Sequence, residues 1–200
     1  MNYKAVLIDF DGVICNSKYF REVYAEKFGM DINILTPFFD NLKETVVIGK
    51  GDLKDQLAEI IDTWGWKGTV DELLEFWLTE DPDIDIRFIE IAQKLQGLGL
   101  KVYLATDQEK YRAQHIWETR GLQNWMDGKF VSSEIGHHKD RTNFFHHVIK
   151  TLDCKPDQIL FFDDSEKKVL SAKSAGVKGF VFKDFERFVH DLNKILSINL

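Results

Sequence analysis

Five short and mainly apolar runs, each four residues long, constrain the fold of this 200-residue chain more than any other feature. Continuous apolar runs of this length are typical of strands that are buried on both faces of a sheet. Helical segments separate the later runs, and alternating strand and helix signals predict a parallel sheet covered by helices on both sides. The runs occupy residues 5–8, 102–105, 129–132, 159–162 and 179–182. We therefore expect an α/β fold with a doubly wound parallel sheet.

The interval between the first two runs has a different character, because it carries several helical stripes and no convincing strand. Thr69 is followed three residues later by Glu72, a pairing that predicts a capping box at the start of a helix. A chain of this length can fill one α/β core and still accommodate a modest insertion. We predict a Rossmann-like core from residues 1–15 and 83–200, with a helical insertion at residues 16–82.

The charge balance limits the classes of partner. The chain has 33 acidic and 26 basic residues, and this net negative charge disfavours nucleic acid and anionic membranes as main partners. No apolar stretch approaches the roughly 20 residues of a membrane-spanning helix. Cys15 and Cys154 are isolated, so neither a zinc site nor a disulfide framework is indicated. We expect a cytoplasmic protein that binds a small molecule.

Reactive side chains follow four of the predicted strands. In an open parallel sheet, ligands bind beyond the carboxyl ends of the strands, so these side chains are candidates for one site. Acidic groups gathered in one crevice repel each other unless a cation or a lysine is present. A few carboxylates with substrate phosphate and water are the usual ligands of Mg²⁺. The candidates are Asp9 and Asp11, Thr106 and Asp107, Lys139, and Asp163 and Asp164.

These residues also resemble the four motifs of the haloacid dehalogenase superfamily in their order and approximate spacing. The resemblance rests on the segment from Asp9 to Ile14, on Thr106 and Lys139, and on the segment from Asp163 to Ser165. It spans nearly the whole chain and implies the Rossmann-like core of that superfamily. The helical insertion after the first motif resembles the family's small cap, which closes over the site and helps to choose the substrate.

The resemblance implies a magnesium-dependent phosphatase that acts on a small phosphorylated metabolite. Asp9 would be the nucleophile that forms an aspartyl-phosphate, and Asp11 would protonate the leaving oxygen and then activate water. Thr106 and Lys139 would bind phosphoryl oxygens, and Asp107 is a further candidate for substrate binding. Mg²⁺ would be held by the Asp9 carboxylate, the Asp11 backbone carbonyl, Asp163 and Asp164. These roles agree with general chemistry, since a carboxylate that attacks an anionic phosphate needs a metal to reduce the repulsion.

Three positions depart from the family pattern. Asp107 and Lys168 stand where the family often has Asn, and Asp140 stands where it usually has Pro. A carboxylate about 5 Å from a bound phosphate would cost roughly 3 kcal/mol at an effective dielectric constant near 20. Asp107 would therefore either turn away toward a cationic or backbone partner, with Lys110 close in sequence, or bind something other than phosphate, such as a substrate hydroxyl. We favour the first option and expect Asp107 to cap the following helix.

Several alternatives remain beside the phosphatase hypothesis. A haloacid dehalogenase would share the nucleophile, but displacing a halide needs no proton donor, so Asp11 argues against it. A phosphosugar mutase would share the core chemistry, and the sequence does not separate the two reactions. A signalling receiver domain lacks both this order of motifs and the insertion. A catalytically weak binding protein is also open, with Asp107 and Lys168 as the only hints. In the insertion, Lys50 and Lys54 are candidates for contact with an anionic substrate.

Overall fold

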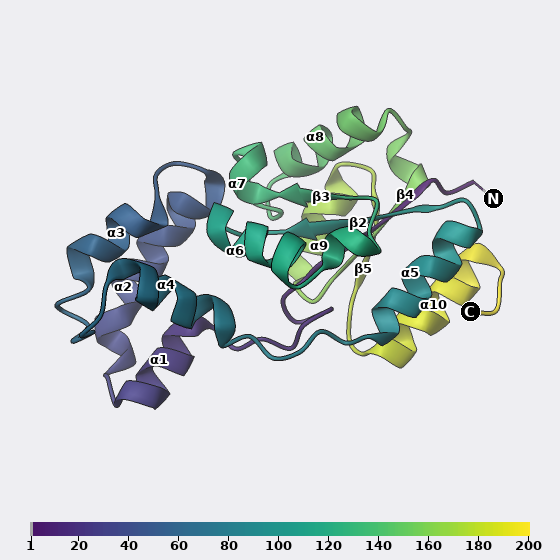
Figure 1. Cartoon of the computed structure of the whole chain (residues 1–200). Helices are drawn as coiled ribbons and strands as arrows, with labels where there is room; N and C mark the ends of the chain where they lie inside the picture. The colour runs from purple at the N-terminus through teal and green to yellow at the C-terminus, as the bar shows by residue number, and fades with distance from the viewer. Residues whose placement is uncertain (1) are drawn as a thin grey trace.

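The core of the protein is a five-stranded sheet in which every neighbouring pair of strands is parallel. The computed structural model describes residues 2–200, so Met1, which the predicted core range includes, lies outside the described residues. The strand order is β3-β2-β1-β4-β5 (Figure 1). The strands are β1 (Ala5–Ile8), β2 (Lys101–Thr106), β3 (Gly128–Val131), β4 (Ile159–Asp163) and β5 (Lys178–Val181). The predicted α/β class and the predicted strand positions are confirmed.

The sheet register brings the predicted site residues to one edge. Ile8 at the end of β1 pairs with Leu104 of β2 on one side and with Phe162 of β4 on the other. Because the three strands run in the same direction, the residues that follow them emerge together. This edge of the sheet therefore gathers side chains that are far apart in the sequence.

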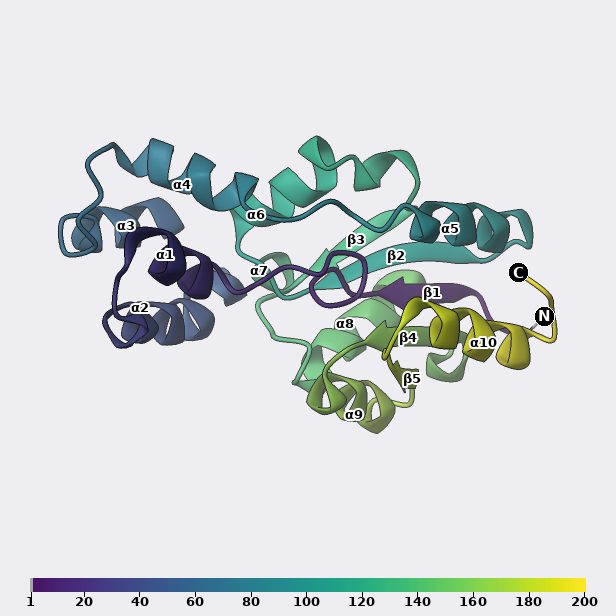
Figure 2. The same ribbon diagram turned by 90° about the horizontal axis from the view of Figure 1, so that it is seen from below.

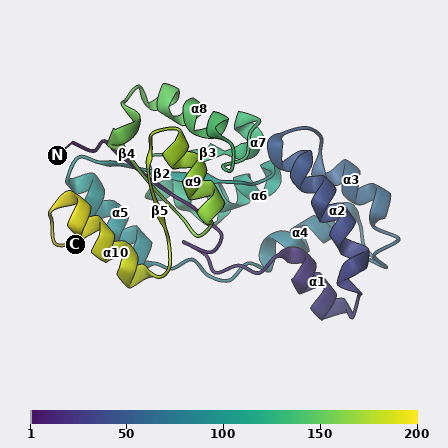
Figure 3. The same ribbon diagram turned by 180° about the vertical axis from the view of Figure 1, so that it is seen from behind.

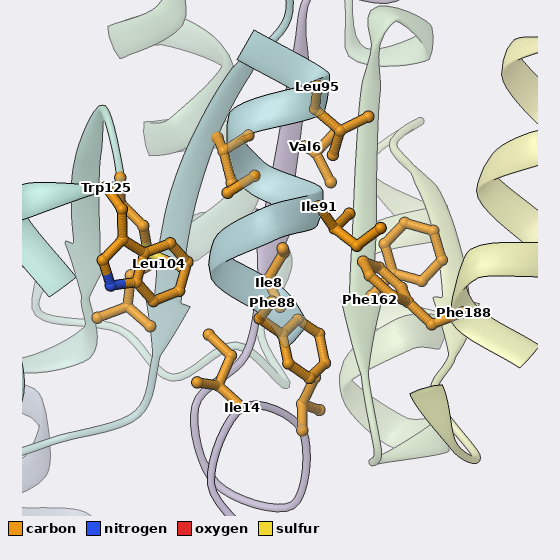
Figure 4. Packing of buried hydrophobic residues seen from close by; sticks show 14 of the residues in the cluster. Val6, Ile8, Ile14, Phe88, Ile91, Leu95, Leu104, Trp125, Phe162 and Phe188 are labelled. Atoms are coloured by element: carbon orange, nitrogen blue, oxygen red, sulfur yellow. The ribbon is translucent and has the colours of Figure 1, made fainter. Parts of the chain in front are cut away.

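Helices cover both faces of the sheet (Figures 1 and 3). The helices α5 (Arg87–Gly97) and α10 (Phe185–Leu196) pack on one face, while α8 (Thr142–Leu152) and α9 (Glu166–Ser174) pack on the other. Successive strand residues point to opposite faces, so Val6 and Ile8 enter the first core and Leu7 enters the second. Figure 4 shows the first core, where Phe88 of α5 and Phe188 of α10 meet the strands. Full burial of each such side chain stabilises the fold by about 1.5–3 kcal/mol.

The connections within the core contain shorter elements. Helix α6 continues directly into the π-helix η2, so the two form one continuous helical segment after β2. The elements are α6 (Lys110–Gln114), η2 (His115–Thr119), η3 (Leu122–Asn124), α7 (Ser132–Ile135) and η4 (Pro156–Gln158).

A helical unit, defined here as residues 20–79, stands beside the sheet and has a hydrophobic core of its own (Figure 2). Its core is rich in aromatic side chains, and the rings of Phe20 and Trp77 stack with their centroids 4.4 Å apart. The predicted capping box is present, because Thr69 Oγ1 accepts from Glu72 N and the Glu72 carboxylate accepts from Thr69 N. The elements are α1 (Phe20–Phe28), α2 (Ile32–Glu44), η1 (Val46–Ile48), α3 (Leu53–Ile60) and α4 (Val70–Thr79).

Two connecting segments, residues 16–19 and 80–86, join the helical unit to the sheet (Figures 1 and 2). Asp85 N donates to Ile14 O at 2.9 Å, and Cys15 Sγ lies 3.3 Å from Pro82 O. The unit also docks through η1, since Ser132 Oγ donates to Val47 O. Among residues 2–200, no helix is both long enough and apolar enough to span a bilayer.

Candidate active site

Three carboxylates converge at the edge of the sheet where β1 and β4 end. Asp9 follows β1 and continues its ladder, because Asp9 N donates to Phe162 O at 3.0 Å. Asp163 ends β4, and Asp164 is the next residue. One oxygen from each of Asp9, Asp163 and Asp164 lies within 4.8 Å of the others. This spacing can hold a single oxygen-ligated cation.

Lys139 bridges two of these carboxylates, those of Asp9 and Asp163. Its side chain is fully buried, and Nζ lies 2.5 Å from Asp9 Oδ1 and 2.7 Å from Asp163 Oδ2. Nζ also donates to Ala105 O at 2.9 Å. An ammonium has three donors, so these three partners account for its full capacity. Contact between Lys139 and a phosphoryl oxygen, as the family resemblance implies, therefore requires exchange of one of these bonds and stays a prediction.

The carboxylates carry more negative charge than the neighbouring lysines neutralise. Burial raises the pKa of Asp9 to about 7, although Lys139 and Lys168 oppose the change. Burial also acts to raise the pKa of Asp163, but Lys139 and Lys168 outweigh it and the pKa falls. The pKa of Asp164 is raised by burial and by the charge of Asp163. A divalent cation at this cluster would favour the ionised form of every carboxylate.

Two buried oxygens at this edge lack hydrogen-bond partners within the described residues. They are Asp9 Oδ2 and Thr106 Oγ1. Buried polar atoms are nearly always paired in native proteins, so an unpaired one indicates a place for an ion, a water or a ligand. The free carboxylate oxygen suits a hard cation or an attack on phosphorus, and the free hydroxyl can donate to a ligand oxygen. The residues present thus fit Mg²⁺ and a phosphate group.

Asp107 stays inside the site and is surrounded by cationic groups and a backbone donor. Its Oδ1 accepts from Lys139 N at 2.9 Å, and its Oδ2 lies 3.7 Å from Lys168 Nζ. His138 Nδ1 is 3.8 Å from Oδ1. Burial acts to raise the pKa of Asp107, but His138, Lys139 and Lys168 outweigh it and lower the pKa to about 2.

The prediction that Asp107 caps the next helix is therefore wrong. Glu109 is the capping residue of α6, and its carboxylate accepts from Tyr111 N at 2.7 Å. Lys110 pairs with Asp52 of the helical unit at 2.5 Å instead of with Asp107. The physical reason is that Lys168 and the Lys139 backbone N–H supply Asp107 with nearer partners, so its charge is compensated without leaving the site.

Asp11 is held by a network that the sequence did not indicate. Both of its oxygens accept from the Arg112 guanidinium, at 2.7 and 2.8 Å. Ser17 Oγ donates to Oδ1, and Gln108 Nε2 donates to Oδ2. Burial acts to raise the pKa of Asp11, but Arg112 outweighs it and lowers the pKa to about 2. Arg112 also binds Asp81, with Nη2 2.8 Å from Oδ2.

These partners of Asp11 differ in how far sequence reasoning could have reached them. Gln108 and Arg112 come shortly after the second strand, so the rule that ligands bind at strand ends could have included them. Ser17 and Asp81 belong to the two connecting segments, and only the folded chain brings both beside Asp11.

Comparison with known proteins agrees with this geometry. Residues 3–176 match the model of the haloacid dehalogenase-like hydrolase family. Over 97% of its length, the chain is 24% identical to D-ribitol-5-phosphate phosphatase from Bacteroides thetaiotaomicron, of which the match covers 98%. It is 28% identical over 100 residues to sesquiterpene phosphatase astK from Aspergillus oryzae. That match spans half of this chain and about half of the relative's length, at 51%.

Solved structures share the whole fold. A HAD family enzyme from Bacteroides thetaiotaomicron superposes with a TM-score of 0.81 at 20% identity, covering 95% of this chain and 98% of that one. A magnesium complex of the same enzyme gives a TM-score of 0.80 at 20% identity, covering 96% and 99%. A predicted HAD-like family hydrolase from Porphyromonas gingivalis gives 0.78 at 18% identity, covering 98% of each chain.

Proposed function

Because the chain belongs to the haloacid dehalogenase-like hydrolase family, we propose that it hydrolyses a small phosphorylated metabolite in a Mg²⁺-dependent reaction that passes through an aspartyl-phosphate on Asp9. The observation that carries this proposal is that Oδ2 of the buried Asp9 accepts no hydrogen bond within the described residues, while Asp9 shares a possible cation site with Asp163 and Asp164. An oxygen of this kind is available to attack phosphorus. The Thr106 hydroxyl at the end of β2 also has no hydrogen-bond partner there.

The site residues divide between the metal and the substrate. Asp9, Asp163, Asp164 and the backbone carbonyl of Asp11 would hold Mg²⁺, which when bound reduces the repulsion between the nucleophile and the phosphate. The Thr106 hydroxyl would donate to a phosphoryl oxygen.

The reaction would use two aspartates in two steps. Arg112 keeps Asp11 ionised in the free protein, and the negative charge of a bound phosphate would favour uptake of a proton by this carboxyl. Asp9 Oδ2 then forms a bond to phosphorus as the bond to the leaving oxygen breaks, and protonated Asp11 gives that oxygen its proton. A water molecule then attacks the phosphorus of the aspartyl-phosphate, Asp11 takes the proton, and inorganic phosphate leaves with Asp9 restored. Proton transfer of this kind typically contributes ~10² to 10⁴ in rate.

The helical unit would act as a cap over the site. Support comes from its position after the first motif and from its docking contacts near the strand ends, where Lys110 and Tyr111 bind Asp52. Closure of a cap excludes water from the first step and lets the unit select the substrate. The full-length similarity to a phosphatase named for D-ribitol 5-phosphate favours phosphorylated sugars and sugar alcohols as first candidates.

Release of inorganic phosphate from a panel of such compounds tests the proposal. We expect turnover with Mg²⁺, none after chelation with EDTA, and none from the Asp9→Asn variant. Turnover that survives in Asp9→Asn would refute the mechanism. Isomerisation of a sugar phosphate without phosphate release would identify a mutase instead.

A further inference from the structure

Donors from three residues, in two separate stretches of the chain, hold the Asp11 side chain. Oδ1 accepts from Ser17 Oγ and from Arg112 Nη2 at 2.7 Å, and Oδ2 accepts from Arg112 Nη1 at 2.8 Å and Gln108 Nε2 at 2.5 Å. Rotation of the carboxylate would break several of these bonds at once. Two of them join charged groups in a bidentate pair, which is the strongest and most directional arrangement available to a carboxylate.

Arg112 is itself fixed by a second carboxylate. Asp81 accepts from Arg112 Nε at 3.1 Å and from Nη2 at 2.8 Å. The exposed fractions of the Arg112 and Asp81 side chains are only 11% and 9%. A buried ion pair loses several kcal/mol when one partner is removed, because the other charge is left uncompensated. The contacts with Asp11 and Asp81 therefore fix the orientation of the Arg112 guanidinium.

This arrangement connects Asp11 to both segments that carry the helical unit. Asp81 lies in the connecting segment 80–86, and Ser17 lies in the connecting segment 16–19. Arg112 comes from α6 on the core side. The orientation of the Asp11 carboxylate is thus tied to the position of the two connections.

We propose that Arg112 is a positioning residue that sets the orientation of the Asp11 carboxylate and joins it, through Asp81, to the connection with the helical unit. This inference rests on the proposed role of Asp11 in proton transfer. When a leaving oxygen approaches Oδ2, the neutral Gln108 contact is exchanged at less cost than a charged one. Arg112 and Ser17 then keep Oδ1 in place.

Arg120 offers a matched control. It holds the same connecting segment, since its guanidinium donates to the backbone oxygens of Asp81 and Pro82. Within residues 2–200, Arg120 forms no hydrogen bond or ion pair with Asp11. Arg112 and Arg120 therefore both bind the connecting segment 80–86, but only Arg112 also contacts the Asp11 carboxylate.

The test compares two aryl phosphates of similar size, 4-nitrophenyl phosphate and phenyl phosphate. Phenolate is the more basic leaving group and depends more on proton donation. The value of kcat/KM covers the step in which the leaving group departs. The kcat/KM for phenyl phosphate divided by that for 4-nitrophenyl phosphate therefore reports on proton donation to the leaving oxygen. Loss of the Arg112 charge also raises the pKa of Asp11, so kcat/KM is measured across pH and each variant is compared at its maximum. There we expect Arg112→Gln to slow phenyl phosphate about 10-fold or more beyond its effect on 4-nitrophenyl phosphate, within the ~10² to 10⁴ of general acid catalysis. Arg120→Gln should slow both substrates by the same factor.

A ratio that is unchanged or raised in Arg112→Gln would overturn the positioning role. Thermal melting shows whether each variant folds. The Arg112→Lys variant is measured with both substrates as well, and it replaces Arg112→Gln in the test if the Gln variant does not fold. Lysine keeps the charge but lacks the planar fork, so an intermediate ratio is expected.

Asp11→Asn separates this inference from the proposed function. If Asp11→Asn selectively slows phenyl phosphate while neither Arg112 variant does, only the positioning role is wrong. If Asp11→Asn slows both substrates equally, the proton-donor role of Asp11 is wrong and the inference falls with it.

Discussion

The Asp107 carboxylate lies 3.7 Å from the Lys168 ammonium, so two departures from the family pattern face each other across the site. Lys168 Nζ is also 3.7 Å from Asp9 Oδ2 and 4.0 Å from Asp163 Oδ1. Burial acts to lower the pKa of Lys168, but Asp9, Asp163 and Asp107 outweigh it and raise the pKa. Lys168 is thus a permanent cation that offsets the extra negative charge of Asp107.

The effects of replacing Asp107 and Lys168 on kcat/KM should therefore depend on each other. Lys168→Asn removes the ammonium that faces Asp107 and leaves this carboxylate less compensated near a bound phosphate. Repulsion of up to roughly 3 kcal/mol corresponds to about a 100-fold loss in kcat/KM. Replacing both residues by Asn removes the repulsion as well as the attraction, so the double variant should recover most of this loss. A double-mutant cycle on kcat/KM for 4-nitrophenyl phosphate measures the coupling.

Lys167→Asn is the control for that cycle. Lys167 pairs with Asp140 at 2.5 Å, and 69% of its side chain is exposed, so its removal should change kcat/KM little. If the Asp107 and Lys168 effects simply multiply in the double variant, the two positions are independent and charge compensation is not their role.

Local sequence patterns sufficed for the strands and for the capping box at Thr69, because burial on both faces and side-chain capping depend on residues close in the chain. The strand-end rule placed Asp9, Asp163 and Asp164 at one edge because parallel strands end on the same side of the sheet. The position of Asp107 could not be predicted. Its partner Lys168 follows a later strand, and the residues next to Asp107 in the sequence suggested only a helix cap. The contacts of Arg112 with Asp11 and Asp81 depend on where the segment 80–86 lies in the folded chain, which no local pattern encodes.

Gly12 allows the close approach of Asp164 to the nucleophile loop. Its φ is +75°, and a Cβ there would lie 2.4 Å from Asp164 Oδ2. Gly12→Ala should displace Asp164 and weaken Mg²⁺ binding by about 10-fold or more, since loss of even a supporting contact commonly costs 10 to 100-fold in metal affinity. Isothermal titration of the protein with Mg²⁺ measures this. Gly136→Ala is the matched control, because Gly136 also has a positive φ but a Cβ there meets nothing within 4 Å. Equal Mg²⁺ affinities in the two variants would contradict the assignment of Asp164.

Gly49 sets how closely the helical unit docks on the core. Its φ is +75°, and a Cβ would lie 2.3 Å from the backbone oxygen of Ser133. Gly49→Ala should push the two parts apart and change the relative kcat/KM values for large and small phosphate esters. Gly65→Ala carries similar backbone strain, at φ +68°, without any contact within 4 Å. An unchanged substrate profile in Gly49→Ala, with melting temperatures equal in both variants, would argue against docking of the unit as a determinant of substrate choice.

Asp127 should make stability depend on pH in the acid range. It accepts from Lys101 Nζ, Val102 N and Gln96 Nε2. Burial acts to raise its pKa, but Lys101 and the backbone N–H of Val102 outweigh it and the pKa is lowered. A carboxyl whose folded pKa is lowered stabilises the fold above its unfolded pKa of about 3.9, and this contribution is lost as pH falls through the folded pKa. Asp127→Asn should cost about 1–2 kcal/mol at neutral pH. Denaturation of both proteins across pH measures the difference, and a gap that does not shrink below about pH 4 would contradict this explanation.

Phosphoryl labelling of Asp9 tests the central claim most directly. A ³²P-labelled aryl phosphate is mixed with enzyme and Mg²⁺, quenched in acid during turnover, and the label is located by peptide mapping. We predict a hydroxylamine-sensitive label on the peptide that contains Asp9 in the wild-type protein and no label in Asp9→Asn. Turnover without any label on that peptide, or label that persists in Asp9→Asn, would contradict the account.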